Sequence, residues 1–149
     1  MLLIDNRAGS KELILPLQKL GLIVESARLD FGDIAFEGLG EKSRIVTIGI
    51  EFKTLQEFVQ AMRSERLQGY QLPGMRGTKQ QPGPYDYCYL LIEGELLYNR
   101  AGQLLIRRRL CTLPMPGHMS VGELFKRRQV LHLCGGLNPI VTTCRKDTL

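Results

Sequence analysis

The amino-acid sequence predicts a single α/β domain. Its 149 residues are enough for one compact domain with a core of its own. Its composition, 44% hydrophobic and 23% charged residues, is that of a globular protein and excludes the disordered and fibrous classes. Short apolar segments typical of strands alternate along the chain with segments that have helical periodicity, which is the pattern of an α/β fold.

The N-terminal segment is predicted to form a strand and a helix. Residues 2–5 (LLID) are typical of a short buried strand, and they end in an aspartate. Ser10 has the position of a cap for a helix that runs to about Leu20. Because Pro16 lies inside this helix, we expect a bend or a late start.

The following segment is predicted to contain the central strand. Residues 22–38 form two strands, or one long bent strand, with an interruption near 32–33. Residues 45–53 (IVTIGIEFK) are apolar enough for a central strand. Thr54 and Glu57 then have the T-x-x-E spacing of a capping box and begin a helix.

The rest of the chain is predicted to be a loop, strands and one more helix. Residues 68–84 are rich in Gly, Pro and Gln and indicate a mobile loop. A buried strand over 85–95 and a hairpin around 100–102 follow. A second S-x-x-E spacing begins a helix over 120–133, and residues 139–143 complete the pattern as a last strand.

Basic charge is concentrated in the C-terminal part of the chain. Residues 1–99 carry 11 Lys and Arg against 13 Asp and Glu, whereas residues 100–149 carry 9 against 2. This asymmetry suggests a polyanionic partner such as nucleic acid, and a merely solvated basic surface is the alternative.

The cysteine spacing and the apolar runs bear on zinc binding and on the cellular compartment. The four cysteines are widely spaced with no C-x-x-C pair, which argues against a zinc cluster and for reduced thiols. Asp5 interrupts the N-terminal apolar run too early for a signal peptide, and no apolar run reaches membrane-spanning length. We expect a cytosolic protein.

Three acidic residues fall at predicted strand ends: Asp5, Asp33 and Glu51. Clustered carboxylates repel one another unless a cation lies among them, and oxygen ligands favour Mg²⁺ or Mn²⁺. Lys53 shares a strand face with Glu51 and could hold a water or a phosphate oxygen. The set suits metal-assisted phosphodiester hydrolysis, and a solvated Glu51–Lys53 ion pair is the alternative.

Four motifs arrive in order at compatible spacings and resemble the XPF-type nuclease domain. They are I-D-N-R (4–7), G-D-I-A-F (32–36), I-E-F-K (50–53) and R-S-E-R-L (63–67). The family patterns are V-D-x-R, G-D-y, V-E-R-K and G-R-L. The resemblance covers about residues 3–72 and is strongest to compact, stand-alone phage and bacterial members. It implies the cytoplasm of a bacterial or phage-infected cell, or the nucleus if the host is eukaryotic. It implies a restriction-endonuclease-like PD-(D/E)-x-K fold, with a central mixed sheet flanked by helices.

The resemblance also implies roles for the acidic strand ends. Asp33 and Glu51 would ligate Mg²⁺ or Mn²⁺ together with the backbone carbonyl of Phe52. Lys53 would position the attacking water or the scissile phosphate. Asp5 would be a catalytic helper near the metal and a candidate further ligand.

The DNA contacts are expected to come from basic and amide side chains. Arg7 and Arg66 match family arginines that face DNA phosphate. The other candidate contacts are Arg63, Gln71, Arg107, Arg108 and Arg109.

The chain departs from the family pattern at four positions, one of which is Gln71, one residue beyond the family's glutamine after G-R-L. Ala8 stands where the family usually has a glutamate, which leaves open whether one or two metals bind, and Glu12 is a candidate substitute acid. Phe52 replaces the arginine of E-R-K, and Glu65 replaces the glycine before Arg66.

The function we expect is that of a metal-dependent DNA endonuclease, selective for flap, fork or junction DNA. A catalytically weak or inactive DNA-binding or dimerisation module of the same fold is the alternative. The resemblance implies a homodimer through the C-terminal part. The candidate surface is the apolar stripe Val121, Leu124, Phe125 and Leu131, although the same stripe could close the core of a monomer.

Overall fold

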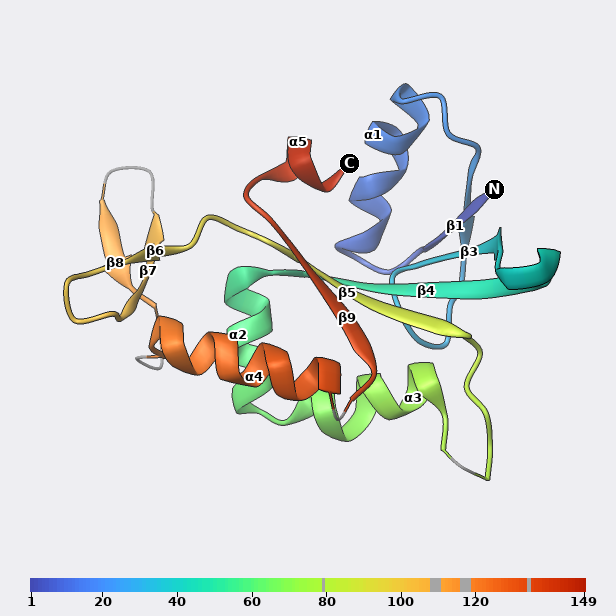
Figure 1. Ribbon diagram of the computed structural model, residues 1–149. Helices are drawn as coiled ribbons and strands as arrows, with labels where there is room; N and C mark the ends of the chain where they lie inside the picture. The colour runs from blue at the N-terminus through green and yellow to red at the C-terminus, as the bar shows by residue number, and fades with distance from the viewer. Residues whose placement is uncertain (79, 108–110, 116–118, 134) are drawn as a thin grey trace.

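The computed structural model describes residues 1–78, 80–107, 111–115, 119–133 and 135–149. Its centre is a six-stranded mixed sheet with the strand order β2-β1-β3-β4-β5-β9 (Figure 1). These strands are β1 (Leu2–Asp5), β2 (Val24–Ala27), β3 (Ile34–Leu39), β4 (Ile45–Thr54), β5 (Tyr87–Glu93) and β9 (Leu137–Thr142). Strand β3 runs antiparallel to both β1 and β4, whereas β4, β5 and β9 are parallel to one another. The predicted α/β fold with a central mixed sheet is confirmed.

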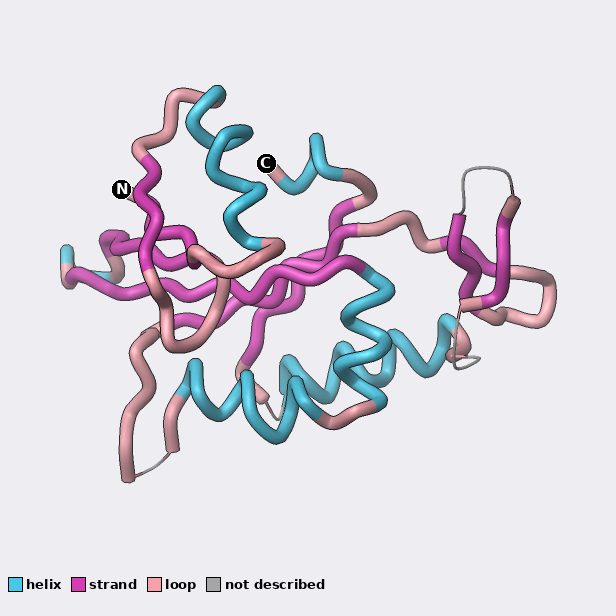
Figure 2. The backbone as a smooth tube through the Cα atoms, turned by 180° about the vertical axis from the view of Figure 1, so that it is seen from behind, coloured by secondary structure: helices cyan, strands magenta, loops and turns pink. Residues whose placement is uncertain are grey.

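Helices cover both faces of this sheet (Figures 1 and 2). One face carries α2 (Leu55–Arg63), the π-helical turn Leu67–Gln71, α3 (Leu72–Arg76) and α4 (Val121–Leu133). The other face carries the 3-10 turn Ser10–Leu13, α1 (Ile14–Lys19) and the C-terminal α5 (Arg145–Thr148). A further 3-10 turn, Glu41–Ser43, joins β3 to β4. Among the described residues, no helix is both long and apolar enough to cross a membrane.

Each face buries its own hydrophobic cluster. Phe58 and Met62 of α2 and Leu131 of α4 pack with Leu90 of β5 in the larger cluster. The smaller cluster is formed by Ile4, Leu13, Leu17 and Ile34 on the α1 side, and Phe52 packs against it. The Phe52 side chain therefore points to the α1 side of the sheet. Its neighbours Glu51 and Lys53 point to the opposite face, because successive side chains alternate along a strand.

The predicted capping box of α2 is present. The Glu57 N–H donates to Thr54 Oγ1 (3.3 Å), and the Thr54 N–H donates to Glu57 Oε2 (2.8 Å). At α4 only half of the predicted box forms: the Glu123 N–H donates to Ser120 Oγ (3.1 Å), while the Glu123 carboxylate accepts from Arg127 (2.8 Å). Both helices begin where the sequence predicted them.

The interpretation of residues 68–84 as a loop was wrong for its first half. The chain is helical from Leu67 to Arg76 because Leu67, Leu72 and Met75 are buried against the sheet. Composition rich in Gly, Pro and Gln favours a loop, but the burial of three apolar side chains outweighs that preference. Between Arg76 and β5, the described residues form no regular helix or strand.

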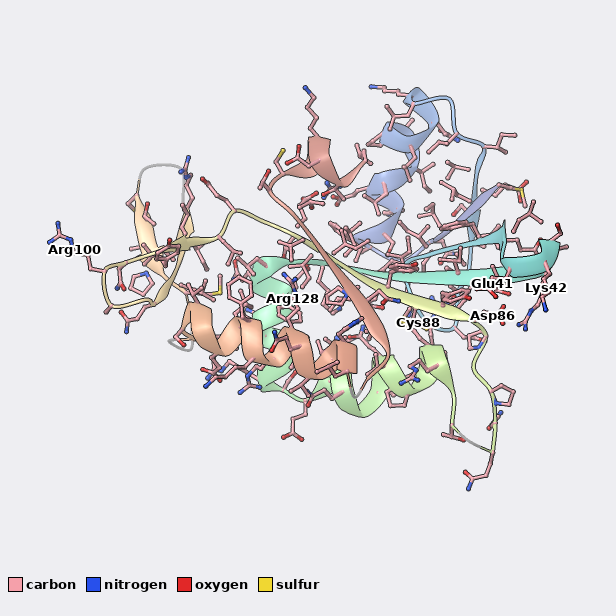
Figure 3. All side chains as sticks on the ribbon, viewed as in Figure 1. Glu41, Lys42, Asp86, Cys88, Arg100 and Arg128 are labelled. Atoms are coloured by element: carbon pink, nitrogen blue, oxygen red, sulfur yellow. The ribbon has the colours of Figure 1, made fainter. Side chains whose placement is uncertain are left out.

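Between β5 and α4 the chain forms a second, three-stranded sheet of β6 (Leu97–Tyr98), β7 (Leu104–Arg107) and β8 (Thr112–Pro114). The β6–β7 hairpin confirms the turn predicted around 100–102. Figure 3 shows Arg100 at its tip, pointing away from the rest of the molecule.

Most of the apolar stripe of α4 that was predicted as a dimer surface is buried within the chain, and the homodimer itself stays a prediction. Leu124 and Leu131 are buried in the core of the single chain, and Val121 packs against the same cluster. Of the four residues only Phe125 is exposed, and the Arg128 guanidinium lies over its ring at 5.6 Å. The alternative interpretation, that the stripe closes the core of a monomer, holds for the other three.

Candidate functional site

The strand register brings the three predicted carboxylates into one row. Ile34 of β3 is the cross-strand partner of Ile4 in β1 and of Ile50 in β4. Because β3 runs antiparallel to both neighbours, the next row contains Asp5, Asp33 and Glu51. Two hydrogen bonds extend the pairing into this row: the Asp5 N–H donates to the Asp33 carbonyl (2.9 Å), and the Asp33 N–H donates to the Ile50 carbonyl (2.8 Å).

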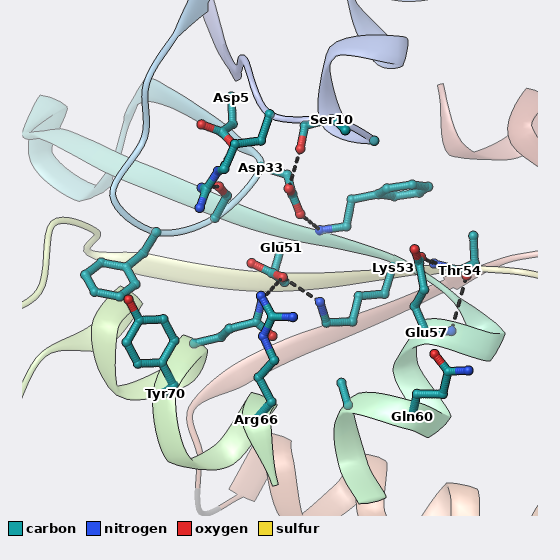
Figure 4. Close-up of a pocket in the computed structure, with 18 of the residues that line it drawn as sticks. Asp5, Ser10, Asp33, Glu51, Lys53, Thr54, Glu57, Gln60, Arg66 and Tyr70 are labelled. Atoms are coloured by element: carbon teal, nitrogen blue, oxygen red, sulfur yellow. Dashed lines mark hydrogen bonds and ion pairs between the residues drawn. The ribbon is translucent and has the colours of Figure 1, made fainter. Parts of the chain in front are cut away.

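This row lies in a cleft with a volume of about 760 Å³. Residues from the 3-10 turn after β1 and from the loop before β3 line one side of the cleft, and residues of α2 and the π-helical turn line the other. Figure 4 shows Asp33 and Glu51 at its centre, between Ser10 on one side and Arg66 on the other. The cleft is open to solvent.

Asp33 is oriented by two hydrogen bonds. Ser10 Oγ donates to Asp33 Oδ1 (2.5 Å), and the Phe52 N–H donates to Asp33 Oδ2 (2.7 Å). Ser10 is buried and does not cap the helix at which the sequence predicted it as a cap. Its hydroxyl instead fixes the carboxylate, a role that the sequence offered no signal for.

Glu51 and Lys53 form a buried pair and not a solvated surface ion pair. Their side chains are 6% and 11% exposed, and Lys53 Nζ donates to Glu51 Oε1 at 2.6 Å. Burial raises the pKa of Glu51, and the negative charge of Asp33 raises it further, while Lys53 opposes both effects. Ionisation of Glu51 is therefore less favourable in the folded protein than that of an ordinary glutamate.

Gln71 contacts Glu51 as well. Its Nε2 donates to the same carboxylate oxygen at 2.5 Å, so Gln71 orients an acidic residue of the site, although the sequence predicted a contact with DNA. The other end of this amide is unusual: Oε1 is buried and has no hydrogen-bond partner among the described residues. A buried acceptor without a donor is costly, which indicates a site completed by a bound group.

Asp5 and Arg7 form a structural clamp. Asp5 is fully buried, and its two oxygens accept hydrogen bonds from the Leu29 N–H (3.1 Å) and from Arg7. Arg7 also donates to the carbonyls of Leu29 (3.0 Å) and Gly32 (3.4 Å). Although burial raises the pKa of Asp5, the hydrogen bonds from Arg7 and Leu29 lower it overall. Both side chains line the cleft and hold the loop that leads to Asp33. The roles predicted from the sequence, a metal helper for Asp5 and a phosphate contact for Arg7, stay predictions.

The other predicted DNA-contacting residues are distributed unevenly. Arg66 lines the cleft and extends toward Glu51 (Figure 4), whereas Arg63 is exposed outside the cleft lining. Arg107 pairs with Glu95 at 3.2 Å, away from the cleft, and Arg108 and Arg109 lie outside the described residues. Ion pairs with acidic neighbours also engage Arg127 and Arg145, so part of the basic C-terminal charge is neutralised within the fold.

Arg145 is a cleft residue that the sequence analysis did not identify as one. It lines the cleft from α5, stacks over the Phe52 ring at 5.1 Å and donates to Glu93 Oε2 at 2.8 Å. The basic pair at 145–146 was visible in the sequence, but only the path of β9 brings Arg145 to the site.

A divalent cation fits the oxygen donors at this site. No group of three His, Cys, Asp or Glu side chains suited to a metal occurs in the described parts of the chain. Mg²⁺, however, is commonly held by one or two carboxylates with waters completing its shell, and Asp33 and Glu51 provide two. In a strand, the N–H and C=O of one residue point to the same side, so the Phe52 carbonyl faces the side of Asp33, as its N–H does. Ala8 and Glu12 also line the cleft, but Ala8 supplies no ligand.

Glu65 explains a departure from the family pattern. Its φ angle is 56°, in the left-handed region that favours glycine. This residue lies between α2 and the π-helical turn, directly before Arg66. Glycine adopts such a conformation without strain, which gives a physical reason for the glycine of the family pattern, whereas this chain adopts it with a glutamate.

No family model and no curated protein matches the sequence of this chain. Solved structures do match its fold. XPF from Aeropyrum pernix has a TM-score of 0.65 and 20% sequence identity over 99% of this chain and 58% of that one. XPF from Aeropyrum pernix in complex with DNA has a TM-score of 0.64 and 19% identity, again over 99% of this chain and 58% of that one. The chain therefore spans somewhat over half the length of these relatives and has the XPF nuclease fold.

Proposed function

We propose that this protein is a metal-dependent DNA endonuclease that hydrolyses phosphodiester bonds. The observation that carries the proposal is the convergence of Asp33, Glu51 and a buried Lys53 in an open cleft. The fold is that of XPF structures, one of them in complex with DNA, which favours DNA as the polymer that enters the cleft.

In this proposal Asp33, Glu51 and the Phe52 carbonyl hold Mg²⁺ or Mn²⁺. The ion polarises the phosphate and lowers the pKa of a bound water when it is present. Ser10 and Gln71 keep the two carboxylates in place. Lys53 is paired with Glu51 at the cleft, where its ammonium group can hold a phosphate oxygen or the attacking water. Asp5 acts indirectly, through the loop that carries Asp33.

Arg66 and Arg145 are the proposed phosphate contacts in the cleft. Both line it, and they approach from different elements, the start of the π-helical turn and α5. Selectivity for flap, fork or junction DNA belongs to the same proposal. It is supported by a cleft that is open at the surface and does not enclose the polymer.

The experiment is a cleavage assay on labelled duplex, flap, fork and four-way-junction DNA with Mg²⁺, with Mn²⁺ and with EDTA. We expect metal-dependent cleavage that is lost in Glu51→Gln and Asp33→Asn, whereas both variants still bind DNA. Asp30→Asn is the matched control, because Asp30 is an exposed carboxylate that lines the same cleft. Undiminished cleavage by Glu51→Gln would show that the site is assigned to the wrong residues.

One observation favours the second candidate, an inactive DNA-binding module. Ala8 supplies no carboxylate where the family has glutamate. Binding to DNA in EDTA, with no cleavage of any substrate in either metal, would establish this alternative. Cleavage that is lost in Glu12→Gln would instead show that Glu12 has taken over the missing acidic role.

A further inference from the structure

An exposed aromatic ring lies in the cleft beside the acidic row. Tyr70, in the π-helical turn, is 64% exposed and lines the same cleft as Glu51. Figure 4 shows it at the opposite end from Thr54 and Glu57. Its ring lies against that of Phe31, from the loop before β3, with centroids 5.7 Å apart and planes tilted by 58°.

Phe31 is a rigid support for this ring. Its carbonyl accepts a hydrogen bond from the Tyr85 hydroxyl at 2.6 Å, and its side chain packs against the larger hydrophobic cluster. Burial raises the pKa of Tyr85 to about 12, so the hydroxyl keeps the proton that it donates. At Gly74 of α3 a Cβ atom would overlap the Phe31 ring, so the glycine makes room for it.

The π-helical turn explains why Tyr70 faces the cleft. Residues four apart share a helix face, and the wider π turn also brings residues five apart together. Arg66, Tyr70 and Gln71 consequently all line the cleft. Gln71 orients Glu51, Arg66 provides a cation, and only the exposed ring of Tyr70 has no task in the proposed reaction.

A cation next to an exposed aromatic ring is the combination that binds single-stranded nucleic acid, because the cation holds the backbone and a base stacks on the ring. In a duplex the neighbouring base pairs cover the faces of each base. Only an unpaired, terminal or extruded base can offer a face to a side chain. A ring on which a base stacks would therefore distinguish unpaired from paired DNA.

We propose that Tyr70, supported by Phe31, is a stacking site for one unpaired nucleobase of the strand bound in the cleft. The proposal rests on the proposed function for the identity of the polymer, but it concerns binding and needs no cleavage. Alanine substitutions at such stacking sites weaken binding by about 5- to 150-fold per base.

The test uses the whole protein in EDTA, so that binding is measured without cleavage. 2-Aminopurine is placed at successive positions in the single-stranded arm of a forked DNA, and its fluorescence and the dissociation constant are recorded. We expect one position, next to the duplex, to be quenched by the parent protein. In Tyr70→Leu the quenching should disappear and the affinity for the fork should fall by about 5- to 150-fold, with little change for blunt duplex.

Two variants serve as controls. Tyr70→Phe keeps an aromatic ring and should behave as the parent. Tyr98→Leu makes the same change at a tyrosine that is 63% exposed but lies on β6, away from the cleft, and should also have no effect. Quenching that persists in Tyr70→Leu, or equal losses on fork and duplex, would overturn the stacking site.

The outcomes separate this proposal from the proposed function. Position-specific quenching that depends on Tyr70, in a protein that cleaves nothing, would keep the stacking site and reject the nuclease. Metal-dependent cleavage with an unchanged dissociation constant in Tyr70→Leu would keep the nuclease and reject the stacking site. Failure of the parent to bind any DNA would reject both.

Discussion

A divalent cation should stabilise the folded protein, and Glu51 should be required for the effect. Without the ion, the row of carboxylates contains a buried Glu51 whose pKa is raised by burial and by Asp33. A cation that binds only the folded state adds RT ln(1 + [L]/Kd), about 2.7 kcal/mol at one hundred times Kd. For a domain of this size that corresponds to an increase in Tm of about 5–11 °C.

Glu51→Gln separates the charge from the shape of the side chain. In EDTA at pH 7 we expect the variant to be at least as stable as the parent. The raised pKa means that ionisation of Glu51 is less favourable in the folded state than in the unfolded state. This penalty is present above the folded pKa of Glu51 and disappears below the ordinary glutamate pKa of about 4.3, where both proteins are neutral at this position. With Mg²⁺ or Mn²⁺ the order should reverse, because the variant lacks an anionic ligand.

Thermal unfolding followed by circular dichroism measures both effects. The samples are the parent, Glu51→Gln and the Asp30→Asn control, each in EDTA and in increasing Mg²⁺ or Mn²⁺ at constant ionic strength. A parent Tm that does not respond to either cation, or an equal gain in Tm for Glu51→Gln, would refute the role of Glu51 as a metal ligand.

Three further changes test the contacts around the site. Arg7→Ala should lower the free energy of unfolding by about 1–3 kcal/mol at pH 7, because it removes a hydrogen bond from a fully buried carboxylate. Because that hydrogen bond lowers the pKa of Asp5, the difference in unfolding free energy between the parent and Arg7→Ala, measured in urea, should diminish as the pH falls below about 3.9. Weaker DNA binding by Arg7→Ala without any loss of stability would contradict the structural clamp. Gln71→Met keeps the size of the side chain but removes the hydrogen-bond donor to Glu51. It should weaken activity or metal affinity by roughly 10- to 100-fold with the fold intact. Cleavage kinetics equal to those of the parent would show that Gln71 does not support the site. At Glu65, where φ is 56°, Glu65→Val should be less stable than Glu65→Gly by about 1–2 kcal/mol in urea unfolding, and equal stabilities would show that the backbone is unstrained there.

The features that the sequence determined by itself depend on spacing along the chain. The capping box at Thr54 and Glu57 and the turn of the β6–β7 hairpin are interactions between near neighbours. The shared face of Glu51 and Lys53 is likewise a consequence of strand geometry. Such features were confirmed because a few residues contain all the groups that form them.

Tertiary structure alone decided which side chains meet across the sheet. Arg7 binds Asp5 and two carbonyls, Ser10 binds Asp33, and Gln71 binds Glu51. Except for the Arg7–Asp5 pair, these contacts join residues about twenty or more positions apart in the sequence, and their partners are set by strand order and register.

The helical segment Leu67–Arg76 and the position of Arg145 have the same origin. Composition predicted a loop over the first, but the burial of Leu67, Leu72 and Met75 against the sheet stabilises helix. Arg145 reaches the cleft because β9 pairs parallel to β5 and returns the C-terminus to the acidic row. Burial and pairing free energies depend on the whole fold, so no local pattern in these segments could have revealed them.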